Sequence, residues 1–202
     1  MKKKEQSERT RLEVLGAAVH EMHRNGFRSA SLENILATTK LSKGALYHHF
    51  SDKRELGYAV IEEYLREQVY QFWIKPLDGC EDPVKCLGEL ITRNIEYMPD
   101  DEVFYGCLLN SLALEMSPVD DGFRIRINQV YELWEHAFVE VLEKGQANGT
   151  VSKDIEPSEV ATFIVATLAG ARSLSKNEQS REPVIACGKS LVRYLNAVCK
   201  PL

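Results

Sequence analysis

The sequence predicts an all-α protein, on two observations. Its 202 residues include only 12 glycines and 7 prolines, and long stretches space apolar side chains three and four residues apart, as on one face of a helix. With 44% hydrophobic residues, the chain can bury a core of one or two domains. We therefore expect a helical protein with its own buried core.

The first helix is expected at Thr10–Asn25, after a mobile basic arm at Met1–Ser7. Gly26 should end it, because glycine is favoured just beyond a helix C-terminus. His20 and His23 have a spacing that could bind a metal, but no Cys or carboxylate cluster accompanies them, so we expect no metal and no cofactor. The apolar face of this helix is predicted to be Leu12, Leu15, Val19 and Met22.

The stretch Ser31–Phe50 predicts two short helices joined by a turn. Ser31 and Ser42 are suited to cap them, because a serine hydroxyl accepts the free N–H groups of a first helical turn. In the second helix, Leu46 and Phe50 should point toward the first. The side chains left facing outward are Lys43, Ala45, Tyr47 and His48.

Such a short, outward-facing helix suits the major groove of DNA. The cap hydroxyl, the amides at the helix start and Lys43 can meet phosphates, while the following residues reach base edges. An ordinary helical hairpin is the alternative.

The segment LSKGALYHHFSDKREL resembles the signature of the tetracycline-repressor (TetR) family of bacterial transcription regulators. The residues that carry the resemblance are Ile35, Leu41, Ser42, Lys43, Gly44, Leu46, Tyr47, Phe50, Lys53 and Leu56. At the turn the family usually has Ala-Gly where this chain has Thr39-Lys40, so we expect Lys40 to accept a positive φ at some cost. The DNA-binding residues expected from this segment are Ser31, Ser42, Lys43, Gly44, Ala45, Tyr47, His48 and Lys53.

A long helix is predicted from Asp52 to about Trp73, ended by Pro76 and Gly79. Asp52 and Glu55 have the spacing of a capping box, and Lys53 lies in the first turn, where a phosphate would be favoured. By the resemblance, this helix joins a small head, the three-helix helix-turn-helix DNA-binding domain at residues 1–51, to a larger helical body, the ligand-binding and dimerisation domain at residues 52–202.

The body should contain further helices at Pro83–Met98, Tyr105–Glu115 and Ile127–Leu142, with an acidic loop at Asp100–Glu102. Two helices follow, each begun by a proline: Pro157–Ser173 is apolar nearly all round, and Pro183–Val198 carries a heptad seam. They resemble the family's four-helix dimer interface; core helices of a monomer are the alternative. The interface residues expected are Phe163, Val184, Gly188, Leu191 and Leu195.

Net charge divides the chain in the same way. Residues 1–54 hold 11 Lys and Arg against 6 Asp and Glu, whereas residues 55–202 hold 14 against 24, so the two parts carry +5 and −10. A basic head can neutralise phosphates while an acidic body is repelled from DNA.

The five cysteines form no CxxC pair, and no signal peptide or membrane span is evident, so we expect reduced thiols in a cytoplasmic protein. Tyr105–Asn110 resembles the Gly-Cys-Leu segment of one TetR branch, in which some members sense electrophiles through this cysteine. The effector residues expected are Cys107, Trp73, Tyr105, Trp134 and Lys176. A reversible ligand in an aromatic pocket, or an inert Cys107, are the alternatives.

The function expected is that of a homodimeric transcriptional regulator, most simply a repressor, which leaves a palindromic operator when a small molecule or an electrophile binds. No nucleotide-binding loop, zinc pattern or nucleophile elbow is present, so we do not expect an enzyme. A thiol-dependent enzyme centred on Cys107, or a DNA-organising protein without an effector, are the alternatives.

Overall fold

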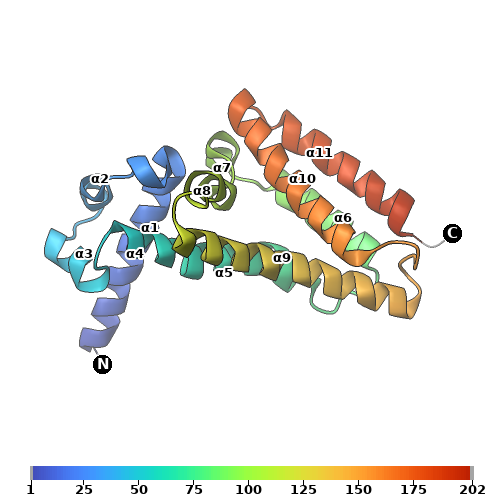
Figure 1. The fold of residues 1–202 in the computed structure, drawn as a ribbon, viewed down its shortest axis with the longest axis horizontal. Helices are drawn as coiled ribbons and strands as arrows, with labels where there is room; N and C mark the ends of the chain where they lie inside the picture. The colour runs from blue at the N-terminus through green and yellow to red at the C-terminus, as the bar shows by residue number, and fades with distance from the viewer. Residues whose placement is uncertain (1, 201–202) are drawn as a thin grey trace. The chain divides into compact units, whose positions relative to one another are not determined.

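The computed structural model describes residues 2–200, and the side chains of residues 4–200. These residues form helices and turns with no strand among them, which confirms the predicted all-α class (Figure 1). In chain order the elements are α1 (Lys2–Ser29), α2 (Leu32–Ala37), α3 (Lys43–His49), α4 (Lys53–Ala59), η1 (Val60–Leu65), α5 (Arg66–Val69), η2 (Tyr70–Ile74), η3 (Lys75–Leu77), α6 (Pro83–Glu96), α7 (Asp100–Tyr105), α8 (Leu108–Met116), α9 (Asp121–Asn148), α10 (Pro157–Glu178), α11 (Glu182–Tyr194) and η4 (Leu195–Cys199).

The chain is organised into two compact units. The first unit contains Met1–Glu67 and Leu108–Val130, and the second contains Gln68–Cys107 and Tyr131–Leu202. The chain therefore passes from one unit to the other after residues 67, 107 and 130. The division expected after Ser51 separates the chain by function, and it stays a prediction.

Helix α1 is longer than the sequence predicts. It already begins at Lys2, so the arm expected at Met1–Ser7 is helical over its described residues; Met1 lies outside them. Gly26 interrupts the helix as expected, with a φ of 77°. Leu12, expected on the buried face, is 55% exposed, because that face is centred on Leu15 and Ala18 and Leu12 lies about a quarter turn away.

A close approach of two aromatic rings to Gly57 joins distant parts of the first unit. A Cβ on Gly57 would lie 2.6 Å from Cε2 of Phe27 and 2.6 Å from Cζ of Phe123, so no side chain fits there. The rings of Phe27 and Phe123 meet edge to face, with centroids 4.6 Å apart, a favourable geometry for aromatic pairs. The core of the head thus includes the start of α9.

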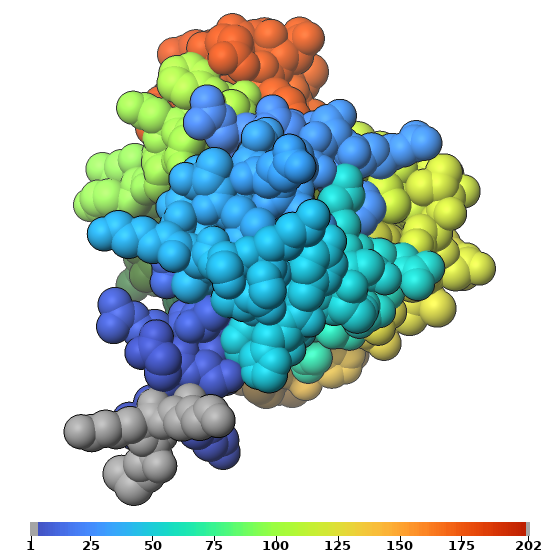
Figure 2. Space-filling model, turned by 90° about the vertical axis from the view of Figure 1, so that its left-hand side faces the viewer, coloured from blue at the N-terminus to red at the C-terminus, as the bar shows by residue number. Residues whose placement is uncertain are grey.

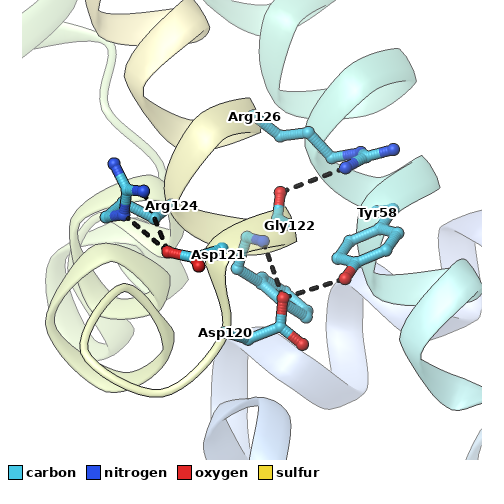
Figure 3. A network of polar contacts seen from close by, with 7 residues as sticks. Tyr58, Asp120, Asp121, Gly122, Arg124 and Arg126 are labelled. Atoms are coloured by element: carbon cyan, nitrogen blue, oxygen red, sulfur yellow. Dashed lines mark hydrogen bonds and ion pairs between the residues drawn. The ribbon is translucent and has the colours of Figure 1, made fainter.

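Polar contacts reinforce this attachment (Figure 3). The Tyr58 hydroxyl donates to Asp120 Oδ1 at 2.8 Å, and the same oxygen accepts the N–H of Phe123 at 3.0 Å. Burial and the neighbouring carboxylate raise the pKa of Tyr58, which keeps the hydroxyl a donor. Arg126 lies over the Tyr58 ring at 4.0 Å and pairs with Glu62 at 2.8 Å. The beginning of α9 is therefore fastened to α4 and η1.

The long helix expected from Asp52 to about Trp73 is present as the succession α4, η1, α5 and η2. Asp52 caps it by accepting the N–H of Glu55 at 2.9 Å. Two stretches, η1 and η2, are π-helical, and such stretches are often found at functional sites. Pro76 lies in the last turn, η3, and Gly79 follows with a φ of 74°.

In the second unit, α10 and α11 lie side by side, and α11 also packs on α6 (Figure 1). The heptad seam of α11 faces the core of the same chain: Leu191 is 1% exposed, and a Cβ on Gly188 would lie 2.1 Å from Cδ1 of Ile95. The expected interface residues Val184, Gly188, Leu191 and Leu195 are thus covered by the chain itself. Phe163, the fifth, is 46% exposed.

The acidic loop expected at Asp100–Glu102 is instead the first turn of α7. Carboxylates are favoured at a helix N-terminus, and basic side chains from α10 and the start of α11 hold two of them. Arg172 pairs with Glu102 at 2.6 Å, and Arg181 pairs with Asp100 at 2.6 Å.

The expectation that all cysteines are free thiols is wrong for two of them. Cys80, just after η3, and Cys86, in the first turn of α6, form a disulfide with their Cα atoms 6.3 Å apart. The intervening Asp82 and Pro83 turn the chain back into α6, which brings the two together. No helix among residues 2–200 has the length and apolar character needed to cross a membrane.

Candidate functional site

Helices α2 and α3 form the predicted helix-turn-helix pair. The Ser31 hydroxyl accepts the N–H of Glu33 at 3.1 Å and of Asn34 at 3.4 Å, and the Ser42 hydroxyl accepts the N–H of Ala45 at 3.2 Å. Both serines cap their helices, as the sequence predicts. The bounds of α3, Lys43–His49, also match the prediction.

The turn between them does not use the expected backbone. Gln179 is the one residue other than glycine with a positive φ among those described, so Lys40 does not adopt that conformation. Instead the Thr39 hydroxyl donates to Leu36 O at 3.0 Å and accepts the N–H of Leu41 at 3.3 Å, while Thr38 Oγ1 donates to Ile35 O at 2.9 Å. The threonine hydroxyls satisfy the backbone groups of this turn, so glycine is not needed.

The outer face of α3 presents polar side chains around a buried anchor. Leu46 is fully buried, whereas Lys43, Gly44, Tyr47 and His48 are exposed. Ala45, expected to face outward, is half-buried. Figure 2 shows α2 and α3, coloured light blue to cyan, as part of one continuous surface. Four of the predicted DNA-binding residues therefore share an accessible helix.

Glu21, which the sequence analysis missed, positions the start of α2. Its Oε1 accepts the N–H of Ser31 at 3.2 Å and the Asn34 side-chain amide at 2.9 Å. Partial burial would raise the pKa of Glu21, but these hydrogen bonds outweigh it and hold the pKa below its usual range. A carboxylate on the polar side of an amphipathic helix gives no sequence signal for this role.

Lys53 is engaged within the head. Its ammonium donates to Arg28 O at 3.0 Å and to Ala30 O at 2.8 Å, and it lies 4.9 Å from the ring centroid of Phe27. The side chain therefore binds one carbonyl in the last turn of α1 and one just beyond it, where a cation is favoured. A phosphate contact by the remaining N–H stays a prediction.

The second unit contains a small, mostly apolar cavity. Trp73 and Trp134 lie against each other in its wall, with ring centroids 5.0 Å apart. The space open to the centre of a water-sized sphere is about 20 Å³, little more than one water molecule needs. The wall also contains Cys107, Arg172, Met98 and Leu168.

Three of the predicted effector residues, Trp73, Trp134 and Cys107, meet in the wall of this cavity. Tyr105 ends α7 and is not part of that wall. The stem of Lys176 packs on the residue before Cys107, since its Cδ would lie 3.2 Å from a Cβ on Gly106. Arg172 was missed, although a lone cation within the apolar stretch of α10 was a usable signal.

Cys107 lies immediately before the first residue of α8 and is half-buried, as expected for a cysteine at a helix start. Burial raises the pKa of the nearby Tyr131 hydroxyl, and the Cys107 side chain adds to that shift. Tyr131 therefore stays protonated beside the thiol.

Two family models match most of the chain. Residues 14–60 match the model described as bacterial regulatory proteins, tetR family, and residues 83–188 match the tetracyclin repressor-like C-terminal domain. The first match covers the helix-turn-helix pair with its flanking helices. The second covers α6 to α10 and the first half of α11.

The chain is also similar to curated regulators along most of its length. It is 28% identical over 159 residues to the HTH-type transcriptional repressor DhaR of Mycobacterium sp. (strain GP1), covering 79% of this chain and 78% of that protein. It is 28% identical over 188 residues to the transcriptional regulator AcuR of Cereibacter sphaeroides, covering 90% and 83%. The fold matches a TetR transcriptional regulator from Chloroflexus aurantiacus, with a TM-score of 0.86 at 23% identity, over 98% of this chain and 100% of that one.

The contacts of Lys53 predict a loss of stability when it is replaced. Lys53→Met should lower the free energy of unfolding by about 1–2 kcal/mol, because the carbonyls of Arg28 and Ala30 lose a charged donor. Lys43→Met is the matched control, since Lys43 is exposed, and it should change stability by no more than about 0.5 kcal/mol. Urea unfolding followed by circular dichroism measures both; equal effects would show that Lys53 does not hold the end of α1.

Proposed function

This chain belongs to the tetracycline-repressor (TetR) family of bacterial regulatory proteins, and from that premise we propose that it represses transcription from a palindromic operator and leaves the operator when an effector binds in its second unit. It is a DNA-binding transcriptional regulator. The observation that carries the proposal is the accessible face of α3, held by the Ser42 cap and the buried Leu46. The matches give no support to a thiol-dependent enzyme or to an effector-independent DNA-organising protein.

In the proposed complex, α3 lies in the major groove. Tyr47 and His48 reach base edges, while the Ser42 hydroxyl, Lys43 and the amides of Gly44 and Ala45 meet phosphates. Ser31 and Lys53 add phosphate contacts at the edges of this surface. Two heads related by a dyad then read half-sites about 34 Å apart, or a multiple of that distance, in the cytoplasm where the chromosome lies.

Replacing residues of α3 should weaken operator binding without unfolding the protein. Tyr47→Ala should lower the operator affinity roughly 10- to 100-fold through a lost base contact. Lys43→Ala should make the slope of log affinity against log salt concentration shallower by about one unit. Lys153→Ala, at an exposed lysine of the second unit, is the control and should change neither. Fluorescence anisotropy over a salt series measures both. Full operator affinity in the Lys43→Ala, Tyr47→Ala double mutant would exclude α3 as the recognition helix.

We propose that the homodimer forms through the outer faces of α10 and α11, not through the buried seam. Phe163 and Leu174 are 46% and 51% exposed, and Ala166 and Gly170 lie between them on one helical stripe. The Phe163 ring rests on Tyr194 of α11, with centroids 4.8 Å apart. Small residues between two large ones allow a partner helix to approach closely.

Two sets of substitutions separate this face from the buried seam. Phe163→Glu with Leu174→Glu should give a folded monomer with little operator affinity, because charges would enter an interface that is otherwise exposed. Leu191→Glu should instead unfold the second unit, since burying a carboxylate costs several kcal/mol. Sedimentation and circular dichroism distinguish the outcomes. A Phe163→Glu, Leu174→Glu protein that remains a dimer would place the interface elsewhere.

The effector is proposed to act in the cavity that Cys107 lines. Cys107 is the last residue of the second unit before the chain enters the first unit at Leu108. A cavity of this size cannot take an organic molecule without movement of its walls, so a ligand binds only a rearranged conformation. Binding therefore shifts the population of conformations, and the proposal is that the shifted state does not fit the operator. An electrophile that adds to Cys107 would have the same effect.

If the thiol is the sensor, Cys107→Ser should bind the operator within about twofold of the parent yet fail to leave it on treatment with a quinone. The reason is that serine keeps the packing but is a far weaker nucleophile than a thiolate. Cys187→Ser, at another half-buried free cysteine, should respond like the parent. Release from a labelled operator is measured for all three proteins. If Cys107→Ser leaves the operator at the same quinone concentration as the parent, the thiol-switch mechanism is wrong and reversible ligand binding remains.

A further inference from the structure

Two residues that line the cavity of the second unit each carry a buried N–H group without an acceptor. Among the described residues, the buried side-chain nitrogens without a hydrogen-bond partner are Arg126 Nε, Trp134 Nε1 and Arg172 Nε. Arg126 Nε lies 2.8 Å from a Glu62 carboxylate oxygen, so a negative charge faces it. Trp134 and Arg172 both line the cavity beside Cys107. Buried polar groups are nearly always paired, and an exception calls for an explanation.

Trp134, the first of these two donors, has apolar surroundings. Trp134 is 4% exposed and packs against the rings of Trp73 and Phe138, with centroids 5.0 Å and 6.2 Å away. Leu168 and Val184 are also buried and line the same cavity. A ligand that enters must be largely apolar, with an acceptor for the donors.

The charge of Arg172 is already balanced. One of its terminal nitrogens lies 2.6 Å from a Glu102 carboxylate oxygen and donates to Gly106 O at 3.1 Å. Among the residues that line the cavity, Arg172 is the one cation, so an anionic ligand would share that cation with Glu102, and an incompletely paired buried charge is strongly disfavoured. A neutral acceptor meets no such penalty.

We propose that the effector is a small, neutral, largely apolar molecule bearing a carbonyl oxygen, and that this oxygen accepts the N–H of Trp134 Nε1 with Arg172 Nε as the second donor. The space already present is little more than one water molecule needs, which suits a carbonyl oxygen. The hydrocarbon part requires Trp73 and Trp134 to separate, so binding selects a wider cavity. This inference rests on the proposed function in one respect, that this cavity is the effector site.

The two tryptophans supply the assay, because they are the only ones in the chain and both line the cavity. The ligands are cyclohexanone, its isostere methylenecyclohexane, in which CH₂ replaces the carbonyl oxygen, and cyclohexanecarboxylate. Cyclohexanone should change the fluorescence of the full-length protein. Trp134→Phe removes the N–H but keeps a ring. It should weaken the binding of cyclohexanone about tenfold, while the affinity for methylenecyclohexane should change less than twofold.

Two further variants control for loss of packing. Trp73→Phe removes the neighbouring indole and should leave the preference for the ketone over its isostere unchanged, with Trp134 as the reporter. Arg172→Lys keeps a cation for Glu102 but lacks Nε–H. It should weaken the binding of the ketone more than that of its isostere, as Trp134→Phe does. If Trp134→Phe weakens ketone and isostere equally, or if the carboxylate binds tightest, the assignment of a neutral carbonyl ligand is wrong. Absence of a fluorescence change with all three ligands would overturn it as well.

Operator binding distinguishes this failure from failure of the proposed function. The parent and Trp134→Phe should bind operator equally without ligand, because Trp134 is not part of the DNA-binding surface. A parent that binds and leaves the operator with any of the three ligands remains a repressor even if the carbonyl assignment fails. A parent that binds no specific DNA would contradict the proposed function whatever the fluorescence shows.

Discussion

The absence of a side chain at Gly57 is the constraint on which the first unit depends. Phe27 from the end of α1 and Phe123 from the start of α9 both approach the point where a Cβ would lie. Any larger residue would push the two rings from α4, and overpacking of this kind destabilises a core. Because the rings meet there, a segment more than 60 residues farther along the chain becomes part of the head.

The polar contacts of the first unit follow from that arrangement. Glu115, at the end of α8, accepts the N–H of Phe27 at 2.8 Å and of Arg28 at 2.7 Å, directly after the break at Gly26. Hydrogen bonds from the Phe123 N–H and the Tyr58 hydroxyl outweigh burial and hold the pKa of Asp120 below its usual range. The turn at the end of α1 and the start of α9 are thus fixed by carboxylates, and the entry to α2 and α3 is fixed with them.

Sequence reasoning succeeded where the determining contacts are local. Ser31, Ser42 and Asp52 cap helices within three residues of themselves, and the bounds of α3 follow from such a cap and from helical periodicity. It failed where the partner is distant. The periodicity of Leu191 and Leu195 shows that one face of α11 is apolar, but a second subunit and the subunit's own α6 would bury that face equally well. Likewise, nothing near Asp100 or Glu102 in the sequence indicates that Arg181 and Arg172 hold them in a helix.

The same distinction explains why Cys107 could be singled out and its setting could not. Its place at a helix start is local, but the cavity depends on Arg172 and Trp134, which lie far along the chain. Gly106 has a φ of 76°, and Lys176 packs where its side chain would be, so the backbone leading to Cys107 has little freedom. Leu108 already belongs to the first unit, so one peptide bond joins the proposed sensor residue to α8. Within the first unit, Glu115 of α8 accepts the N–H groups of Phe27 and Arg28, and α8 is therefore the element through which we propose that a change at Cys107 reaches the support of the DNA-binding helices.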